Sequence, residues 1–315
     1  MKIKILDRKA IGFDTPLEML SELGELTVYD NTSKEELLER CYDADVLVFN
    51  KVKIDREIIE NSKSLKLICV FATGYDNIDI NAAKEHGVAV CNVPGYSTES
   101  VTLYTLATVT ALATKLFEYR QYVACGEYSK SDSANKLAPV YHEIAGKTWG
   151  IIGYGNIGKS VAKVAEALGA RVLLNKRTPQ GLPGEVDIDT LCKESDIISV
   201  HCPLNDGTRG IINEKRLSLM KRDVILVNEA RGAVLDEAAV AAFVKEGKIG
   251  GFGCDVYSSE PFRENHPYYD IKNLPNVILT PHAAWASYEA RERCVKTICE
   301  NIKSYLNGEK NNRIV

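Results

Sequence analysis

The stretch Lys147-Thr-Trp-Gly-Ile-Ile-Gly-Tyr-Gly-Asn-Ile-Gly158 decides the fold of this chain. Its first part, Trp149 to Ile152, is short and apolar, which is typical of a buried strand. Three glycines follow at once, at positions 153, 155 and 158. A glycine pattern of this kind is weak evidence by itself, because ordinary turns carry it too.

The segments that follow the glycines make the pattern specific. Ser160 to Ala170 repeats alanine and valine at helical spacing, and Arg171 to Leu174 is a second apolar run. Strand, glycine turn, helix and second strand together are typical of a dinucleotide-binding unit. The glycines permit the turn, admit the pyrophosphate and let the helix pack closely, while the helix N-terminus attracts the phosphates. The predicted phosphate site is Gly153, Tyr154, Gly155, Asn156, Ile157 and Gly158.

The composition excludes several classes of function. A length of 315 residues is enough for two domains, and a net charge of −4 draws the whole molecule to neither nucleic acid nor anionic membrane. We expect no membrane partner, because no apolar run is long enough to span a bilayer and no signal peptide is visible. The nine cysteines form no Cys-x-x-Cys pair and lie mostly in apolar runs, which predicts free thiols, no metal site and a cytoplasmic location.

The first half of the chain, residues 1 to 98, alternates apolar and amphipathic runs. This rhythm predicts a parallel sheet covered by helices on both faces. We expect strands at Ile3–Leu6, Leu26–Tyr29, Val46–Phe49, Leu67–Phe71 and Val88–Cys91, and helices at Pro16–Leu23, Ser33–Cys41, Asp55–Ser62 and Ile80–His86. Ser33 and Glu36 have the spacing of a capping box. This half has no glycine fingerprint, so we expect the cofactor to bind elsewhere.

The middle of the chain is predicted to connect the two domains. Thr102 to Phe117 predicts one long helix, and residues 119 to 146 predict a polar loop or arm, with disorder as the alternative. The strand–helix rhythm then resumes. Further strands are expected at Asp196–Val200, Val224–Asn228, Gly250–Val256 and Val277–Thr280, followed by a helix at Ser287–Leu306 with Gly308 as its stop.

Polar residues follow the strands of the second half, where an open parallel sheet binds its ligands. They are the glycine turn, Asn175-Lys176-Arg177, His201-Cys-Pro-Leu204, Asn228 to Gly232, Asp255 with Glu260, and Pro281-His282. The first half adds Thr73 to Asn77. For any one of these residues alone, an ordinary surface or loop position is the favoured interpretation. Six along one edge favour an active site.

These side chains limit the chemistry. In nicotinamide enzymes the cofactor carries the hydride, while the protein supplies binding, orientation and a proton donor, usually histidine. His282 stands at a strand end, Glu260 is a carboxylate suited to holding its ring, and Arg231 is suited to gripping a carboxylate in bidentate fashion. Backbone N–H groups around Thr73 and Gly74 suit the same anion. The set indicates reduction of a 2-keto acid.

The chain resembles the D-isomer-specific 2-hydroxyacid dehydrogenases over essentially its whole length. The motifs that carry the resemblance are Thr73 to Asp79, Asn92-Val-Pro-Gly95, the glycine turn, His201 to Leu204, Asn228-Glu-Ala-Arg-Gly232, Asp255-Val-Tyr-Ser-Ser-Glu-Pro261 and Thr280-Pro-His282. The resemblance implies an enzyme with Arg231, Glu260 and His282 as catalytic residues. It places Asp255 near the nicotinamide.

The resemblance also implies the architecture. A flavodoxin-like substrate domain, residues 1–98 and 289–315, and a Rossmann dinucleotide-binding domain, residues 99–288, are expected with a cleft between them, in a homodimer built through residues 119–146. Beyond the glycine turn, the implied cofactor-binding residues are Asn175, Lys176, Arg177, Thr178, His201, Cys202, Pro203, Thr208, Asn228, Glu229, Ala230, Asp255 and His282.

Within the family, Pro94 to Thr98, His282 to Ser287 and Asn50-Lys51 are similar to the glycerate dehydrogenase, or hydroxypyruvate reductase, branch. This implies hydroxypyruvate or glyoxylate as substrate, and a D-2-hydroxy acid as product. The implied substrate-binding residues are Lys51, Thr73, Gly74, Arg231 and Trp285, although Trp285 fits domain packing equally well.

The branch usually carries a polar pair shortly after Ser100-Val101. Here it is Leu103-Tyr104, so the identity of the substrate stays open. The alternatives are a longer D-2-hydroxy acid, a formate or phosphite relative, or a non-catalytic dinucleotide sensor like the corepressors of this fold. Glu260 favours the hydroxyacid enzymes over formate dehydrogenases.

The cofactor expected is NADP, with NAD as the alternative. NAD-binding units place an acidic side chain after the second strand to bind the ribose hydroxyls. Here Lys176 takes that position, Arg177 follows, and no acid comes before Glu185. Lys176 and Arg177 would attract a 2′-phosphate, and Asn175 and Thr178 can donate hydrogen bonds to it. A basic turn that tolerates either cofactor is the other interpretation.

Overall fold

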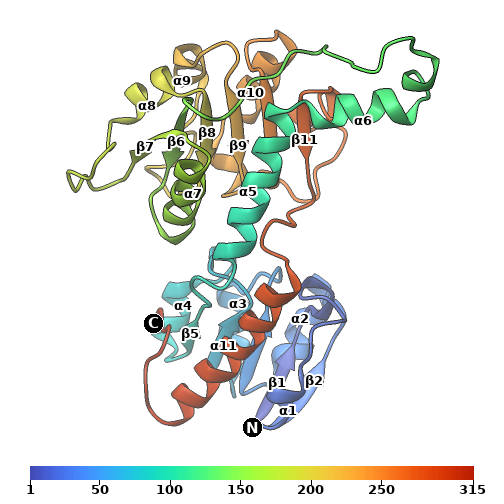
Figure 1. Ribbon diagram of the computed structural model, residues 1–315. Coiled ribbons are helices and arrows are strands. Elements are labelled where there is room, and N and C mark those ends of the chain that lie inside the picture. The colour runs from blue at the N-terminus through green and yellow to red at the C-terminus, as the bar shows by residue number, and fades with distance from the viewer. The chain divides into compact units, whose positions relative to one another are not determined.

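The computed structural model describes all 315 residues and divides them into two compact units. The first comprises Met1–Ser97 with Ala286–Val315, and the second comprises Thr98–Trp285. The expected bounds, after residues 98 and 288, lie one and three residues further along the chain. Each unit is a parallel sheet with helices on both faces (Figure 1).

The first unit is built on a five-stranded sheet of order β2-β1-β3-β4-β5, with every pair parallel. The strands are β1 (Lys2–Ile5), β2 (Glu25–Val28), β3 (Val46–Phe49), β4 (Leu67–Val70) and β5 (Ala89–Cys91). Every residue of β3 and β4 is buried, as expected for strands covered on both faces. The strand order reverses between β1 and β3, where such sheets bind ligands.

Two helices, α1 (Glu18–Ser21) and α11 (Tyr288–Leu306), pack together on this sheet. A second set, α2 (Lys34–Cys41), α3 (Arg56–Asn61) and α4 (Ile80–Glu85), pack against one another in turn. The predicted capping box is confirmed, since Ser33 and Glu36 exchange side-chain-to-backbone hydrogen bonds. The predicted stop is also confirmed, because α11 ends before Gly308, which adopts the positive φ of 77° typical of a residue past a helix end.

The second unit has a six-stranded parallel sheet of order β11-β10-β9-β8-β6-β7. The strands are β6 (Thr148–Ile152), β7 (Arg171–Asn175), β8 (Ile197–Val200), β9 (Ile225–Asn228), β10 (Gly251–Cys254) and β11 (Val277–Leu279). The order reverses at β6, between β7 and β8, so the glycine turn leaves the sheet at its switch point. Trp149 on β6 is fully buried, and its Nε1 donates to Ser199 Oγ at 3.0 Å.

Helices α5 (Thr98–Ala113) and α7 (Asn156–Ala167) pack together and against the strands on one side of this sheet. Helices α8 (Ile188–Glu194), α9 (Glu214–Leu219) and α10 (Glu237–Lys245) form a second packed row. Small residues allow the close approach of α5, because a Cβ on Gly253 of β10 would collide with the Thr108 side chain.

The prediction of one long helix over Thr102 to Phe117 is wrong. Helix α5 ends at Ala113, Lys115 adopts a left-handed φ of 54°, and α6 (Leu116–Ala124) starts in a new direction, with a bend of 65°. The apolar composition continues through the break, so periodicity alone could not show it. The segment 119–146, expected to be irregular, therefore begins inside a helix. It extends away from the sheet of its own unit (Figure 1).

All nine cysteines are free, and only Cys125 is exposed. No single helix combines the length and apolar composition of a membrane span; α5 and α6 meet that test only when taken jointly, as a bent pair.

Candidate active site

The predicted site residues of the second unit lie beyond the carboxyl ends of its strands. The glycine turn follows β6, His201 follows β8, Arg231 follows β9, Asp255 and Glu260 follow β10, and His282 follows β11. Because parallel strands end at one edge of a sheet, the topology brings these residues to the same edge.

The glycine turn is shaped by close backbone approaches. Gly153 has a φ of 95°, and a Cβ there would lie 2.6 Å from Cys202 N, so the turn packs directly on the loop after β8. A Cβ on Gly158 would collide with the Gly153 carbonyl oxygen. Gly155, which caps α7, has open space around its Cβ position and offers no side chain to the first N–H groups of the helix. These groups can bind an anion.

His201 adds a polar group beside this turn. Neither of its ring nitrogens has exposed surface or a hydrogen-bond partner in the protein, and burial lowers the pKa of the ring to about 3. The ring is therefore neutral at ordinary pH and has a donor and an acceptor to satisfy. A dinucleotide, with its phosphates on the α7 N-terminus and polar groups near His201, fits the residues present.

The loop after β7 is held by an acidic residue from within itself. Both oxygens of the Glu185 carboxylate accept the Gln180 N–H, at 3.1 and 2.9 Å, and one also accepts the Leu182 N–H at 2.9 Å. These backbone bonds lower the pKa of Glu185. Lys176 Nζ donates to the Gln180 side chain, and Arg177 is exposed. Glu185, the first acid after β7, is thus committed to the backbone of this loop.

The predicted pair Glu260 and His282 is in contact, with His282 Nδ1 and Glu260 Oε2 2.6 Å apart. The other carboxylate oxygen of Glu260 accepts the Tyr257 N–H at 3.1 Å. Both side chains stay partly accessible, at 23% for His282 and 28% for Glu260. The carboxylate is thereby oriented from one side and fixes the imidazole on the other.

Asp255 holds the backbone around His282. Its carboxylate accepts the Thr280 hydroxyl at 2.5 Å and the N–H groups of Ala283 and Ala284 at 2.9 and 2.8 Å, while its carbonyl accepts the His282 N–H at 2.8 Å. His282 has a φ of 56°, a left-handed conformation that costs a non-glycine residue about 1–3 kcal/mol. The Asp255 hydrogen bonds offset that cost and determine the direction of the ring.

Arg231 is positioned by the end of β9. The fully buried Asn228 donates its Nδ2 to the Arg231 carbonyl at 2.9 Å and accepts the Ala230 N–H at 3.1 Å. The next residue, Gly232, lies so close to Tyr257 that a Cβ there would collide with the Tyr257 backbone. The loop after β9 that carries Arg231 is therefore packed directly on the segment that leads to Glu260.

A buried cluster that the sequence did not reveal supports the same segment. Glu237, in the first turn of α10, accepts the Ser258 N–H at 2.9 Å and the Ser258 hydroxyl. His266 Nδ1 accepts the Tyr268 N–H at 3.2 Å, so its Nε2 carries the proton donated to Glu237 at 3.1 Å. In the sequence, Glu237 looks like any acidic residue at a helix start.

The predicted residues of the first unit follow β3, which borders its switch point, and the neighbouring strand β4. Asp7, after β1, accepts the backbone N–H groups of Asn50 at 3.0 Å and Lys51 at 2.6 Å, both after β3. Burial raises the pKa of Asp7 to about 6. Thr73, followed by Gly74, donates its hydroxyl to Val93 O at 2.8 Å. Asp7 is the residue that sequence reasoning missed here, since one acid after a strand carries no distinguishing pattern.

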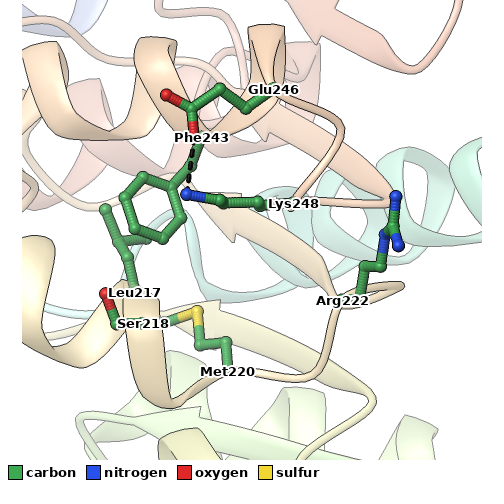
Figure 2. A pocket seen from close by; sticks show the side chains of 7 residues that line it. All are labelled: Leu217, Ser218, Met220, Arg222, Phe243, Glu246 and Lys248. Atoms are coloured by element: carbon green, nitrogen blue, oxygen red, sulfur yellow. Dashed lines mark ion pairs between the residues drawn. The ribbon is translucent and has the colours of Figure 1, made fainter.

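A cavity of about 540 Å³ lies elsewhere on the second unit (Figure 2). Its lining comes from the last turns of α9 and α10 and the residues after them, which precede β9 and β10, so it lies at the opposite edge of the sheet. It contains an ion pair of Lys248 with Glu246 at 2.6 Å. None of the predicted site residues lines it.

Comparison with known proteins gives relatives over nearly the whole chain. Residues 106–284 match the family described as D-isomer specific 2-hydroxyacid dehydrogenase, NAD binding domain. A glycerate dehydrogenase of Methylorubrum extorquens is 38% identical over 99% of this chain and 98% of its own length. A hydroxypyruvate reductase of Blautia hydrogenotrophica is 36% identical over 98% of each. Among solved structures, an acyclic imino acid reductase in complex with NADPH and D-Arg has a TM-score of 0.90 at 34% identity, covering 100% of both chains.

The glycine turn provides a matched pair of variants. We expect Gly155→Ala to leave thermal stability unchanged, because its Cβ meets nothing, and to weaken dinucleotide binding, because the methyl group occupies the face offered to the phosphates. Gly158→Ala should weaken binding and also lower stability by about 1–3 kcal/mol through its collision with backbone. Thermal unfolding and dinucleotide titration measure both. Unchanged affinity in Gly155→Ala would show that the phosphates bind elsewhere.

Proposed function

This chain belongs to the D-isomer specific 2-hydroxyacid dehydrogenase family, and on that premise we propose that it reduces hydroxypyruvate or glyoxylate, preferring NADPH. Family membership makes it a nicotinamide-dependent reductase of small 2-keto acids. The finer statements, which concern the keto acid, the preferred dinucleotide and the role of each residue, are the proposal. Its main support is the contact of His282 with Glu260. Beside it lies the Asp255 clamp, by which we mean the hydrogen bonds that the Asp255 carboxylate accepts from the backbone after His282.

The protein residues have three roles in this proposal. When bound, the nicotinamide supplies the hydride. Arg231 binds the substrate carboxylate and carbonyl through its planar fork. His282 gives a proton to the carbonyl oxygen from Nε2, because Glu260 engages Nδ1. The carboxylate also stabilises positive charge on the ring during transfer.

The substrate is proposed to be small. Lys51, Thr73 and Gly74 are its proposed carboxylate-binding residues in the first unit, where Asp7 fixes the Lys51 backbone. Trp285, the last residue of the second unit, would wall the pocket or serve in packing. Leu103, in place of the polar residue usual in this branch, is 66% exposed. A panel of glyoxylate, hydroxypyruvate and longer keto acids ranks these candidates.

The non-catalytic sensor is the less favoured function. The two relatives named above are enzymes, and this chain matches each of them over nearly its whole length. The chain also keeps Arg231, Glu260 and His282. A sensor would bind the dinucleotide without consuming it, so loss of NADPH absorbance with hydroxypyruvate separates the two functions.

The preference for NADPH rests on the loop after β7. Lys176 and Arg177 stand where an acidic residue would bind the ribose of NAD, and the nearest acid, Glu185, is occupied by Gln180 and Leu182. The NADPH bound to the imino acid reductase is consistent with this family accepting that cofactor. A charge-assisted hydrogen bond to the 2′-phosphate contributes about 1.5–3 kcal/mol.

We expect kcat/KM with hydroxypyruvate to be higher for NADPH than for NADH in the wild type. In Lys176→Asp/Arg177→Ala the preference should fall about tenfold or more, since an attraction is removed and a repulsion added. Arg222→Ala, an exposed arginine at the opposite edge of the sheet, is the matched control and should leave it unchanged. A wild type that prefers NADH would overturn the proposed cofactor. An unchanged preference in the double variant would place the selectivity outside this loop.

We further propose that the arm, residues 119–146, joins two copies of the chain. The arm and the start of α6 carry apolar side chains that their own unit leaves exposed: Leu116, Phe117, Val123, Leu137, Val140 and Tyr141. Leu137 is 83% exposed and Val140 is 71% exposed, and such clusters mark contact surfaces.

A cytoplasmic location is also part of the proposal, and the free thiols, which suit a reducing compartment, support it.

Sedimentation should give a dimer for the wild type and a monomer for Leu137→Asp/Val140→Asp, because buried carboxylates would face each other across the proposed contact. Leu306→Asp, at a leucine that is 56% exposed in the first unit, is the control and should remain a dimer. A monomeric wild type would contradict this assembly.

A further inference from the structure

Glu229 lies in the loop after β9 that also carries Arg231. Its side chain contacts helix α5. Thr105 Oγ1 is hydrogen bonded to Glu229 Oε2, and Thr108 donates its hydroxyl to Oε1 at 3.4 Å. Glu229 is only 9% exposed, and Thr105 is fully buried. The loop that carries Arg231 is thus attached to α5 through one buried carboxyl group.

The single proton of the Thr105 hydroxyl constrains the state of that carboxyl group. Thr105 Oγ1 lies within hydrogen-bond distance of two oxygens, the Val101 carbonyl at 2.8 Å and Glu229 Oε2. A hydroxyl has one proton, and a carbonyl can only accept. If Thr105 donates to Val101, the bond to Glu229 requires a proton on the carboxyl. The chain then runs from Thr108 to Oε1, and from Oε2–H to Thr105 and on to Val101.

The charges around Glu229 favour the same state. Asp255, at the end of β10, faces it with a negative charge, and the neighbouring Cys254 thiol is buried. Arg231, on the same loop, donates its Nη1 to the Ala230 carbonyl, and His282 approaches Asp255 through its backbone N–H. Burial raises the pKa of Glu229 to about 8 and Asp255 adds to the shift, against the hydrogen bonds of Thr105 and Thr108, which lower it.

We propose that Glu229 is held as a neutral carboxylic acid that fastens the Arg231 loop to helix α5. It is a positioning residue for the arginine, and this rests on the proposed role of Arg231. Ionisation would leave Oε2 and the Thr105 oxygen facing each other, unless Thr105 gave up its bond to Val101. The loop would then loosen above the pKa of the group, without any change in Arg231 itself.

The effect of pH on stability has a definite sign. Glu229 has its pKa raised from 4.5 in the unfolded chain to about 8 in the folded one. The stability it contributes is therefore full below 4.5 and is lost as pH rises to about 8. Glu229→Gln is a permanent stand-in for the neutral acid, because its amide donates to Thr105 and accepts from Thr108.

The first experiment measures the folding equilibrium by denaturant titration at intervals from pH 5 to 9. Relative to Glu229→Gln, the folding constant of the wild type should fall about tenfold per pH unit between the two pKa values. Glu166→Gln, at an exposed glutamate on α7, is the matched control: it keeps Glu229, so the ratio of the wild-type folding constant to that of Glu166→Gln should stay flat with pH. A wild-type to Glu229→Gln ratio that is flat with pH would overturn the proposal, because it would mean an ionised Glu229.

The second experiment tests the positioning role through Thr105. Thr105→Val keeps the shape but removes the hydroxyl, and should lower kcat/KM for keto acids about tenfold to a hundredfold through a higher KM. Thr105→Ser should restore it, and both should bind the dinucleotide alike. An equal loss in the serine and valine variants would show a packing effect and overturn the positioning role. The first experiment needs no substrate, so its result stands apart from the proposed function.

Discussion

The hydrogen bonds of the Asp255 carboxylate are the interaction on which the candidate active site depends. The carboxylate accepts three hydrogen bonds from the loop after β11 and lies at the end of β10, so it joins two neighbouring strands at their carboxyl ends. His282 is held between those contacts in a left-handed conformation that its own side chain disfavours. Glu260 can then meet the ring, because the Tyr257 segment that orients it begins two residues after Asp255.

Much of the fold could be predicted from the sequence because its information is local. The glycine turn, the capping box at Ser33 and the fully apolar strands β3 and β4 each follow from a few adjacent residues. The proximity of Glu260 and His282, the pair proposed to be catalytic, could also be predicted, since both follow strands of one parallel sheet, and such ends meet at one edge. Their contact at 2.6 Å confirms that expectation of proximity.

Other features depend on contacts between distant segments. The break at Lys115 lies inside an apolar run whose composition does not change, so only the backbone reveals it. Glu237 and Asp7 look like ordinary acids after a loop or a strand, and only the fold brings Ser258 and Lys51 to them. Glu229 was grouped with the cofactor residues by its motif, and its side-chain contacts with Thr105 and Thr108 appear only once α5 is packed on the sheet.

The central claim is that the Asp255 clamp and Glu260 place His282 as the proton donor of the reaction. The most direct measurement is the turnover of His282→Ala with hydroxypyruvate, together with its affinity for the dinucleotide. The account predicts that kcat falls by about 10²–10⁴-fold, the usual effect of losing a general acid, while dinucleotide affinity stays nearly unchanged. A variant with near-normal turnover would contradict it and would reduce His282 to a structural residue of its loop.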